Sequence, residues 1–229
     1  MVFLPKAKNG EVGEASNTRP LNITNGDNRI LANAVRYRLE PIMEQWITKE
    51  QRGFLGGRSL IHNVVEIDTA MAEQALQSSE GAAILFDFRA AFPSVIHTFL
   101  TDALKHLGLP KGMISFVEAL YHNNFCDILL SGSRMKGFEL KCGIRQGCPL
   151  SPLIFAICSD LILRRIKRLC KGVCHRAFAD DLAAVSEDLL RDLPTFSRIF
   201  SEYGLISGLE LNWQISSFMP LGLEPLERR

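Results

Sequence analysis

The sequence lacks the features that would mark a membrane, secreted or repeat protein. No apolar run approaches the roughly 18 residues that a membrane-spanning helix needs, and Met1 to Leu4 is too short for a signal sequence. We find no internal repeat and no low-complexity segment. The sequence therefore predicts an intracellular protein without a membrane segment, and it does not decide between cytoplasm and nucleus.

The six cysteines lack the paired Cys-x-x-Cys spacing that is typical of zinc sites. Cys170, Cys174 and His175 come nearest to a metal cluster, but a fourth ligand has no evident source. We therefore expect free, buried thiols, and with them a reducing compartment.

What is present is the composition of a folded soluble protein, with 47% hydrophobic and 22% charged residues. The 229 residues suffice for one large domain or two small lobes. A formal net charge of +1 gives no overall sign of nucleic-acid binding, although net charge averages over local clusters.

Hydrophobic periodicity predicts helices over residues 27–46, 60–77, 94–107, 112–121, 153–169 and 189–203. Pro41 is expected to interrupt the first helix, and Ser151 is expected to be the N-cap of the fifth. Strand-like runs cover residues 82–88, 125–131, 138–142 and an alternating stretch within 207–220. Residues 1–17 read as an extended arm, and residues 51–59 as a glycine-rich loop.

The run from Ala82 to Phe88 contains a single acid, Asp87. Its length and the preceding Gly81 favour a central strand that is buried on both faces. A carboxylate within such a strand is costly unless it binds a cation. The run alone leaves a structural and a functional interpretation of Asp87 equally open.

A second acidic position is the pair Asp180 and Asp181, which lies between two apolar runs. This pattern predicts a tight hairpin whose turn carries both acids. Because Asp is a favoured turn residue, an isolated pair of this kind is usually only a turn. Combined with Asp87, the pair has the composition of a two-metal site for phosphoryl transfer, since Mg²⁺ prefers hard carboxylate oxygens.

Several motifs, in order, resemble those of reverse transcriptases of the non-LTR retrotransposon type. Those typical of the palm are Phe-Asp-Phe-Arg-Ala-Ala-Phe (86–92), Gly-Ile-Arg-Gln-Gly-Cys-Pro-Leu-Ser-Pro (143–152) and Phe-Ala-Asp-Asp (178–181). Arg-Pro-Leu-Asn-Ile (19–23) and Gln-Arg-Gly-Phe-Leu-Gly-Gly-Arg-Ser (51–59) resemble fingers motifs, and Ser-Gly-Leu-Glu-Leu-Asn (207–212) resembles the segment that follows the palm acids.

The resemblance implies an α+β fold with the fingers and palm subdomains of a right-handed polymerase, and an antiparallel palm sheet backed by helices. Residues 1–80 would form a fingers-like segment, 81–220 the palm and 221–229 a short tail. Nothing in the sequence resembles the thumb, an endonuclease or a zinc-knuckle DNA reader, so we expect a truncated or decayed copy of a longer retroelement protein.

The resemblance also assigns roles to individual residues. Asp87, Asp180 and Asp181 would be the catalytic acids and would bind Mg²⁺, or Mn²⁺ as a substitute. Phe92 would lie under the incoming sugar, where a ring collides with a ribose 2′-hydroxyl. The remaining assignments are nucleotide contacts by Lys6, Arg19, Gln146 and Gly147, and a template contact by Arg58. The implied partners are an RNA template, a DNA primer and dNTPs, with a thumb or endonuclease supplied by a longer parent protein.

Two departures from the family pattern bear on activity. Ile215 stands three residues after Asn212, where relatives usually carry a lysine that is thought to protonate the leaving pyrophosphate. Losing a general acid typically costs about two to four orders of magnitude in rate. Pro93 replaces an acid found in many relatives, but that acid is not a metal ligand.

Three alternatives to a polymerase core remain open at this point. A catalytically silent nucleic-acid-binding remnant is favoured by Ile215 and by the missing thumb. A fragment of a group II intron-type maturase shares these motifs, but no basic maturase domain is present in the sequence. A palm-fold phosphotransferase unrelated to polymerisation would not require both Arg19 and the turn that contains Gln146.

Overall fold

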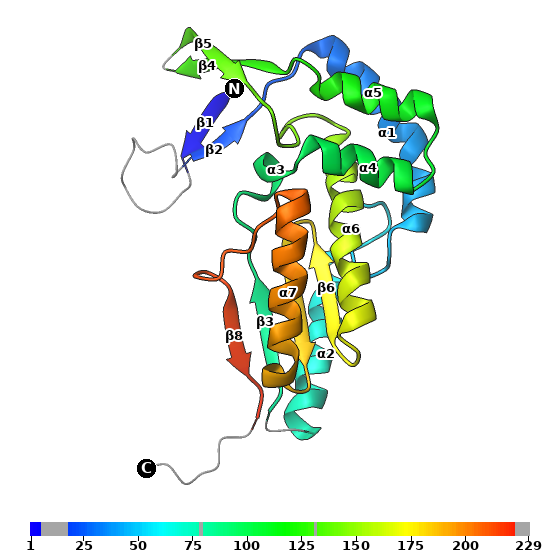
Figure 1. The fold of residues 1–229 in the computed structure, drawn as a ribbon, viewed down its shortest axis with the longest axis vertical. Helices are drawn as coiled ribbons and strands as arrows, with labels where there is room; N and C mark the ends of the chain where they lie inside the picture. Colours follow the sequence, from blue (N-terminus) through cyan, green and yellow to red (C-terminus); the bar gives the residue numbers. More distant parts are fainter. Residues whose placement is uncertain (6–17, 78–79, 131, 223–229) are drawn as a thin grey trace.

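Two four-stranded sheets, each packed against helices, make up the protein (Figure 1). The computed structural model describes residues 1–5, 18–77, 80–130 and 132–222. The upper sheet has the strand order β2-β1-β4-β5, and the lower sheet has the order β6-β7-β3-β8. The α+β class that the sequence predicts is confirmed.

The upper sheet joins the start of the chain to a hairpin from its middle. Its strands are β1 (Val2–Pro5), β2 (Thr18–Leu21), β4 (Phe125–Leu130) and β5 (Ser133–Glu139). Strand β1 pairs antiparallel with β2 and parallel with β4. A boundary at residues 80 and 81 therefore does not separate the two sheets, because β4 and β5 belong with the first strands.

The lower sheet is antiparallel throughout, as predicted. Its strands are β3 (Ala82–Phe86), β6 (Cys174–Phe178), β7 (Asp181–Ser186) and β8 (Ser217–Pro220). Strand β3 lies between β7 and β8, which confirms it as a central strand. Its burial is less complete than predicted, since Leu85 is 52% exposed whereas Ile84 is fully buried.

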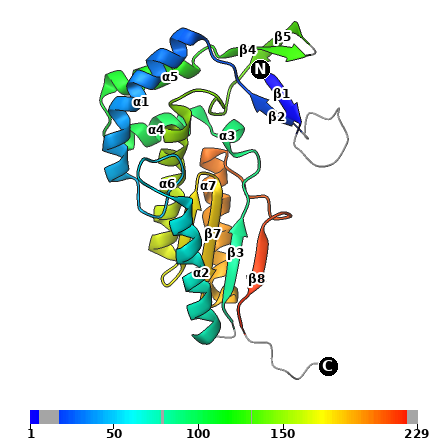
Figure 2. The same cartoon turned by 180° about the vertical axis from the view of Figure 1, so that it is seen from behind.

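Helices cover both faces of the lower sheet (Figures 1 and 2). Helices α6 (Ser151–Leu169) and α7 (Leu189–Ser207) lie on one face, and α2 (Leu60–Gln77) lies on the other. The remaining helices are α1 (Gly26–Trp46), α3 (Ala91–Ser94), α4 (His97–His106) and α5 (Lys111–Tyr121). Among the described residues, none of these helices is long and apolar enough to cross a membrane.

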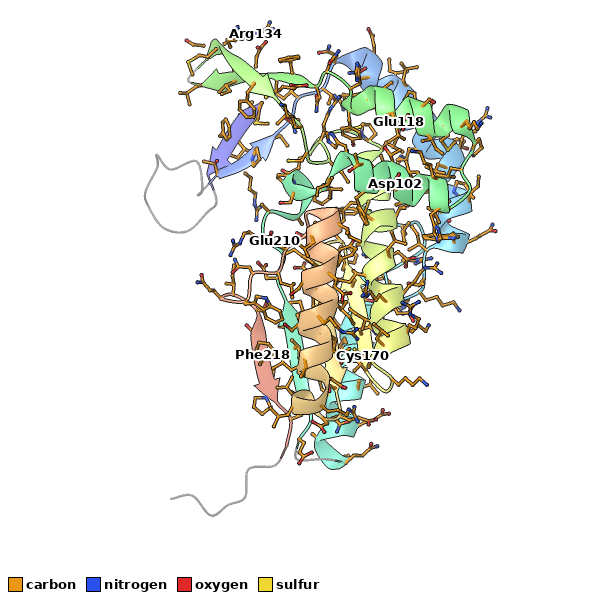
Figure 3. The ribbon with its side chains drawn as sticks, in the orientation of Figure 1. Asp102, Glu118, Arg134, Cys170, Glu210 and Phe218 are labelled. Atoms are coloured by element: carbon orange, nitrogen blue, oxygen red, sulfur yellow. The ribbon has the colours of Figure 1, made fainter. Side chains whose placement is uncertain are left out.

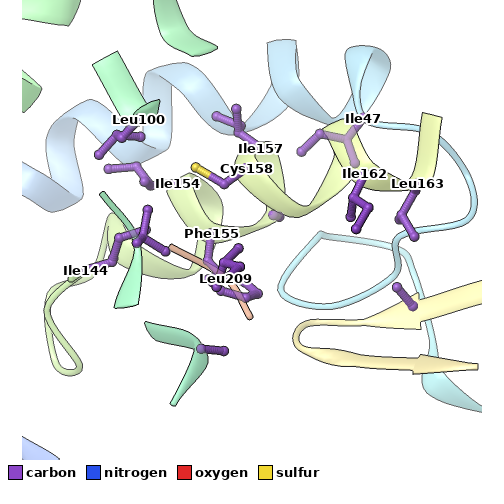
Figure 4. Packing of buried hydrophobic residues seen from close by; sticks show 14 of the residues in the cluster. Ile47, Leu100, Ile144, Ile154, Phe155, Ile157, Cys158, Ile162, Leu163 and Leu209 are labelled. Atoms are coloured by element: carbon purple, nitrogen blue, oxygen red, sulfur yellow. The ribbon is translucent and has the colours of Figure 1, made fainter. Parts of the chain in front are cut away.

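Helix α6 runs through the centre of the hydrophobic core (Figure 4). Ile154, Phe155, Ile157 and Cys158 are at most 1% exposed and point to different sides of the helix. An α-helix that is apolar around most of its circumference is stable only when neighbouring elements surround it. Its packing against α1, α4 and α7 therefore ties the upper part of the molecule to the lower sheet.

The cysteine prediction is confirmed in part. All six thiols are free, but only Cys148, Cys158 and Cys170 are buried, and Cys142 is exposed. Burial raises the pKa of the Cys158 thiol to about 12, so this group is neutral and inert at ordinary pH.

Two expectations about helix boundaries are wrong. Pro41 does not interrupt α1, because it lies on an exposed face where water can solvate the carbonyl of Tyr37, which is itself 76% exposed. Ser151 is the first residue of α6 rather than its N-cap, and the N-cap position is held by Leu150 without a side-chain hydrogen bond.

The helix expected over residues 94–107 is split into α3 and α4. Residues Val95 and Ile96 have extended ψ angles and form hydrogen bonds with distant segments. The Ile96 N–H donates to the Ser207 carbonyl at 2.8 Å, and the Val95 carbonyl accepts from the Gly143 N–H at 2.7 Å. Because these backbone groups have tertiary partners, they are not available to a continuous helix.

Two strand expectations also need correction. Strand β5 covers residues 133–139 instead of 138–142, so the β4–β5 hairpin is tighter than predicted. Within residues 207–220 only β8 is a strand of the sheet. The alternation of apolar residues at the start of this segment has another cause. Leu209 and Leu211 are buried from a loop that follows Gly208, the left-handed C-cap of α7.

Candidate active site

The three acids predicted from the sequence come together at one end of the lower sheet. The antiparallel pairing of β3 with β7 ends at Phe86 and Leu182, so Asp87 and Asp181 are the next residues on the two strands. Asp180 lies beside Asp181 in the turn between β6 and β7, where Phe178 pairs with Asp181. The predicted hairpin is confirmed, but its turn carries only Asp180, and Asp181 is the first residue of β7.

The carboxyl group of Asp181 is affected by burial and by its acidic neighbours. Partial burial raises the pKa of Asp181, and the nearby carboxylates of Asp180 and Asp87 raise it further. In the part of the chain that the structure describes, none of the three forms an ion pair. Three negative charges therefore lie close together here, and no cation of the described residues is ion-paired with them.

The chemistry of this cluster suits a divalent cation, although its side chains do not converge on one point. Carboxylate oxygens are the ligands that Mg²⁺ prefers, and Mg²⁺ retains water in place of missing protein ligands. Within the described ranges, no group of three or more His, Cys, Asp or Glu side chains lies in a geometry that could hold a metal ion. The donor set fits a hard cation, and the arrangement as it stands does not enclose one.

The segment after α7 holds the backbone around Asp87. The Asn212 N–H donates to the Asp87 carbonyl at 2.8 Å, and the Asp87 N–H donates to Ser216 Oγ at 3.2 Å. Between these two contacts lies Ile215, whose side chain is 61% exposed. The position at which the family resemblance led us to expect a lysine is thus close to the Asp87 backbone and open to solvent.

An aromatic stack lies below the loop that follows Asp87. The ring of Phe92 stacks on Phe155 of α6, with centroids 4.4 Å apart and an angle of 12° between the planes. Phe54 meets the edge of Phe92 at 6.1 Å and also contacts Phe178, two residues before Asp180. Phe92 is thus held between Phe155 of α6 and Phe54 of the glycine-rich loop.

Phe54 was not singled out from the sequence, and its backbone is unusual. It has φ 62° and is 44% exposed. A bulky residue in the left-handed region is strained by about 1–3 kcal/mol and is found most often at functional sites.

The turn that contains Gln146 and Gly147 lies against two other predicted segments. The Gln146 carbonyl accepts from the Asn22 N–H at 2.9 Å, just after the strand that carries the exposed Arg19. The Ile144 N–H donates to the Phe92 carbonyl at 2.7 Å. Gly147 has φ 113°, and a Cβ atom there would overlap the Asn22 carbonyl oxygen, so glycine is required.

Lys6 and Arg58 complete the set of predicted site residues. Lys6 lies outside the described residues. Arg58 is engaged within the protein, since its guanidinium donates to four backbone carbonyls, those of Glu44, Ile47, Thr48 and Gln51, and its template contact stays a prediction. These bonds fasten the glycine-rich loop to the end of α1 and occupy both terminal nitrogens of Arg58.

Gln51 was also overlooked. Its side chain is completely buried and contacts the backbone of Ala179, immediately before the two acids of the hairpin. A single glutamine in a loop carries no periodicity and no spacing signal, so only the three-dimensional structure identifies this contact.

Comparison with known proteins shows the family of the chain. A family profile described as "Reverse transcriptase (RNA-dependent DNA polymerase)" matches residues 4–224. The chain is 25% identical, over 92% of its length, to an uncharacterised 149 kDa protein of transposon TX1 from Xenopus laevis, and covers 17% of that protein. It is 26% identical, over 90% of its length, to a Pol polyprotein of retrotransposable element R2 from Popillia japonica, and covers 30% of it. The chain thus spans less than a third of the length of these relatives.

Solved structures share the fold. Telomerase from Candida tropicalis, in its apo form, superposes with a TM-score of 0.56 at 13% identity, over 84% of this chain and 40% of that one. The same telomerase with a fragment of telomeric RNA gives a TM-score of 0.58 at 12% identity, over 84% and 32%. This likeness confirms the fingers and palm architecture, with the lower sheet as palm sheet. Because the profile covers nearly all of the sequence, with the acidic cluster at the end of that sheet, the chain belongs to the reverse transcriptase family and is of the non-LTR retrotransposon type.

Proposed function

We propose that this chain is the catalytic core of an RNA-directed DNA polymerase, which adds deoxynucleotides to a DNA primer on an RNA template. The observation that carries the proposal is the meeting of Asp87, Asp180 and Asp181 at the end of the palm sheet, where no described residue forms an ion pair with them. An RNA partner is supported by the retrotransposon relatives and by the telomerase that was solved with telomeric RNA.

The three acids would hold Mg²⁺, or Mn²⁺ in its place. Asp87 on one strand and Asp180 and Asp181 on the neighbouring hairpin are the residues that would hold the ions. Divalent cations would supply activation of the primer 3′-hydroxyl and neutralisation of the triphosphate charge. The carboxylates would orient the ions, and the surrounding side chains would place the substrates.

Four residues would position the incoming nucleotide. Arg19 is exposed on β2 and would pair with triphosphate oxygens. The ring of Phe92, supported from below, would exclude a 2′-hydroxyl, while Gln146 and Gly147 would line the space beside the base. The glycine allows a close approach of the backbone.

A catalytically silent RNA-binding remnant is the second candidate, and Ile215 is the observation that favours it. An isoleucine cannot donate a proton to the leaving pyrophosphate. The site would then bind substrates and extend a primer slowly or not at all.

The test is primer extension on an RNA template with purified protein and Mg²⁺ or Mn²⁺, comparing the wild type with Asp180→Asn and Asp102→Asn. Asp102 is a suitable control because it is exposed on α4 (Figure 3). Its Oδ1 lies 3.6 Å from Lys105 Nζ in a weak surface ion pair. We expect extension by the wild type and by Asp102→Asn, and loss of extension in Asp180→Asn. Template binding without extension in all three proteins would support the remnant instead.

A further inference from the structure

The loop that follows α1 runs directly beside the catalytic hairpin. The Ala177 N–H donates to the Glu50 carbonyl at 2.8 Å, and the Arg52 N–H donates to the Ala177 carbonyl at 2.9 Å. Gln51 lies between these two contacts and forms an isolated parallel bridge with Ala177. The loop thus acts as a short extra strand along β6, on the side away from β7.

The side chain of Gln51 is fully buried and uses all of its hydrogen-bonding capacity. Its Oε1 accepts from the Ala179 N–H at 3.0 Å and from the Gly53 N–H at 2.8 Å. Its Nε2 donates to the Ala179 carbonyl at 3.1 Å and to Ser159 Oγ at 2.8 Å. An amide has two acceptor and two donor positions, and here each has a partner.

Ala179 is the residue that most needs such support. It has φ 59° although it is not glycine, and this conformation costs an L-residue roughly 1–2 kcal/mol. It is followed directly by Asp180, so the orientation of its two peptide planes sets the direction in which the acids leave the strand. One side chain binds both the N–H and the carbonyl of this residue.

Ser159 connects the arrangement to the core. It lies on α6, is 6% exposed, and donates through Oγ to the Ala156 carbonyl at 3.2 Å. Gln51 therefore joins the hairpin tip to the central helix and to the glycine-rich loop. Methionine would fill a similar volume but form none of the four bonds, and asparagine is one methylene shorter.

We propose that Gln51 is a positioning residue, which holds Ala179 in its left-handed conformation and so fixes the direction of Asp180 and Asp181. The expected effect on kcat rests on the proposed polymerase function. The expected effect on the backbone of Ala179 does not depend on that function. Gln51 itself contacts no substrate. The glycine-rich loop acts through it on the geometry of the catalytic hairpin.

The test compares Gln51→Met with Gln74→Met. Gln74 is also a buried glutamine, 6% exposed, but it lies on α2 and forms no hydrogen bond with the hairpin. Ser159→Ala is a milder variant, because it removes one anchor of the Gln51 amide and leaves the other three bonds in place. For each protein we would measure thermal unfolding, hydrogen exchange of the Ala179 amide, and kcat and KM for a dNTP in primer extension.

We expect faster exchange of the Ala179 amide in Gln51→Met and a smaller increase in Ser159→Ala. We expect kcat to fall on the order of 100-fold in Gln51→Met, since misplacement of catalytic groups by about 1 Å has this effect, with KM changed less than kcat. Gln74→Met should lose stability without either change. Wild-type exchange and kcat in a folded Gln51→Met would overturn the proposal. Absence of extension by the wild type would count against the proposed function alone, since amide exchange still tests the role of Gln51.

Discussion

Gly53 packs directly against the backbone of Ala179. A Cβ atom at residue 53 would lie 2.8 Å from the Ala179 Cα and closer still to its nitrogen. The glycine is needed here for close approach rather than for a left-handed backbone, because its φ is not positive. Any side chain at this position would displace the hairpin tip.

Gly53→Ala should therefore destabilise the protein by about 1–3 kcal/mol, the usual cost of overpacking. Loss of primer extension should exceed what the loss of stability explains, because the displaced atoms precede Asp180. Urea unfolding and extension assays measure the two effects. Gly112→Ala, in α5 with no atom within 4 Å of the added methyl group, is the control and should be neutral or stabilising.

Phe92→Ala should weaken the discrimination between deoxynucleotides and ribonucleotides. Removing the ring opens space for a 2′-hydroxyl, and steric discrimination of this kind is worth roughly 10–200-fold. The ratio of kcat/KM for dCTP and CTP measures the change. Phe116→Ala removes another partly buried ring, on α5, and should leave the ratio unaltered. An unchanged ratio in Phe92→Ala would contradict the proposal that this ring contacts the sugar of the incoming nucleotide.

Ile215→Lys should raise the rate of extension by about 10²–10⁴-fold, the typical contribution of a general acid. The substitution is not expected to disturb folding, since Ile215 is 61% exposed. Single-turnover extension measures the chemical step. Leu190→Lys, at an 83% exposed position on α7, adds the same charge at another position and controls for electrostatic attraction of nucleic acid. Equal acceleration by both variants would contradict a role as proton donor.

Arg58→Met should lower stability without changing the electrostatics of template binding. The guanidinium satisfies four backbone carbonyls, and leaving buried acceptors unsatisfied costs about 1–3 kcal/mol each. The slope of log K against log salt for RNA binding should stay as in the wild type. A slope reduced by about one unit would restore Arg58 as a phosphate contact. Arg38→Met, on the exposed surface of α1, controls for the lost charge.

Glu66 should make the stability of the hairpin region dependent on acid pH. Hydrogen bonds from Arg52 and then Arg176 lower its pKa to about 2, against a slight opposing effect of burial. Because the folded pKa lies below the unfolded value near 4.5, this stabilisation is complete above about pH 4.5 and is lost as the pH falls toward 2.

Unfolding by urea between pH 3 and pH 7 tests this contribution. The wild type should be more stable than Glu66→Gln at pH 7, and the difference should shrink below about pH 4.5. It should be modest, since the Glu66 side chain is 39% exposed. Glu73→Gln, at an exposed position on the same helix, should show no such convergence.

Helices and strands whose buried residues recur at regular spacing could be predicted from the sequence. The apolar run before Asp87 and the two runs around Asp180 and Asp181 fixed the strands, and therefore the meeting of the acids. The β5 strand was misplaced because six of its seven residues are exposed, so that no apolar alternation marks it.

The supporting contacts of the site could not be predicted. Gln51, Arg58 and Gly53 act through hydrogen bonds and close packing with backbone atoms that are distant in sequence. Nearly every residue has the same backbone groups, so a contact with the backbone does not require a particular residue type at the contacted position. A sequence motif can indicate that the loop matters, but the backbone atoms that the loop contacts are identified only by the three-dimensional structure.

The parallel pairing of β1 with β4 has a consequence for the timing of folding during synthesis. Val2 pairs with Leu129, so at ribosomal rates of about 5–20 residues per second the first strand waits roughly 6–25 s for this partner. β3 waits in turn for β7 and β8, with its apolar residues unpaired. The apolar residues of β3 in the nascent chain thus stay accessible to chaperones and to aggregation until the β6–β7 hairpin and β8 have left the ribosome.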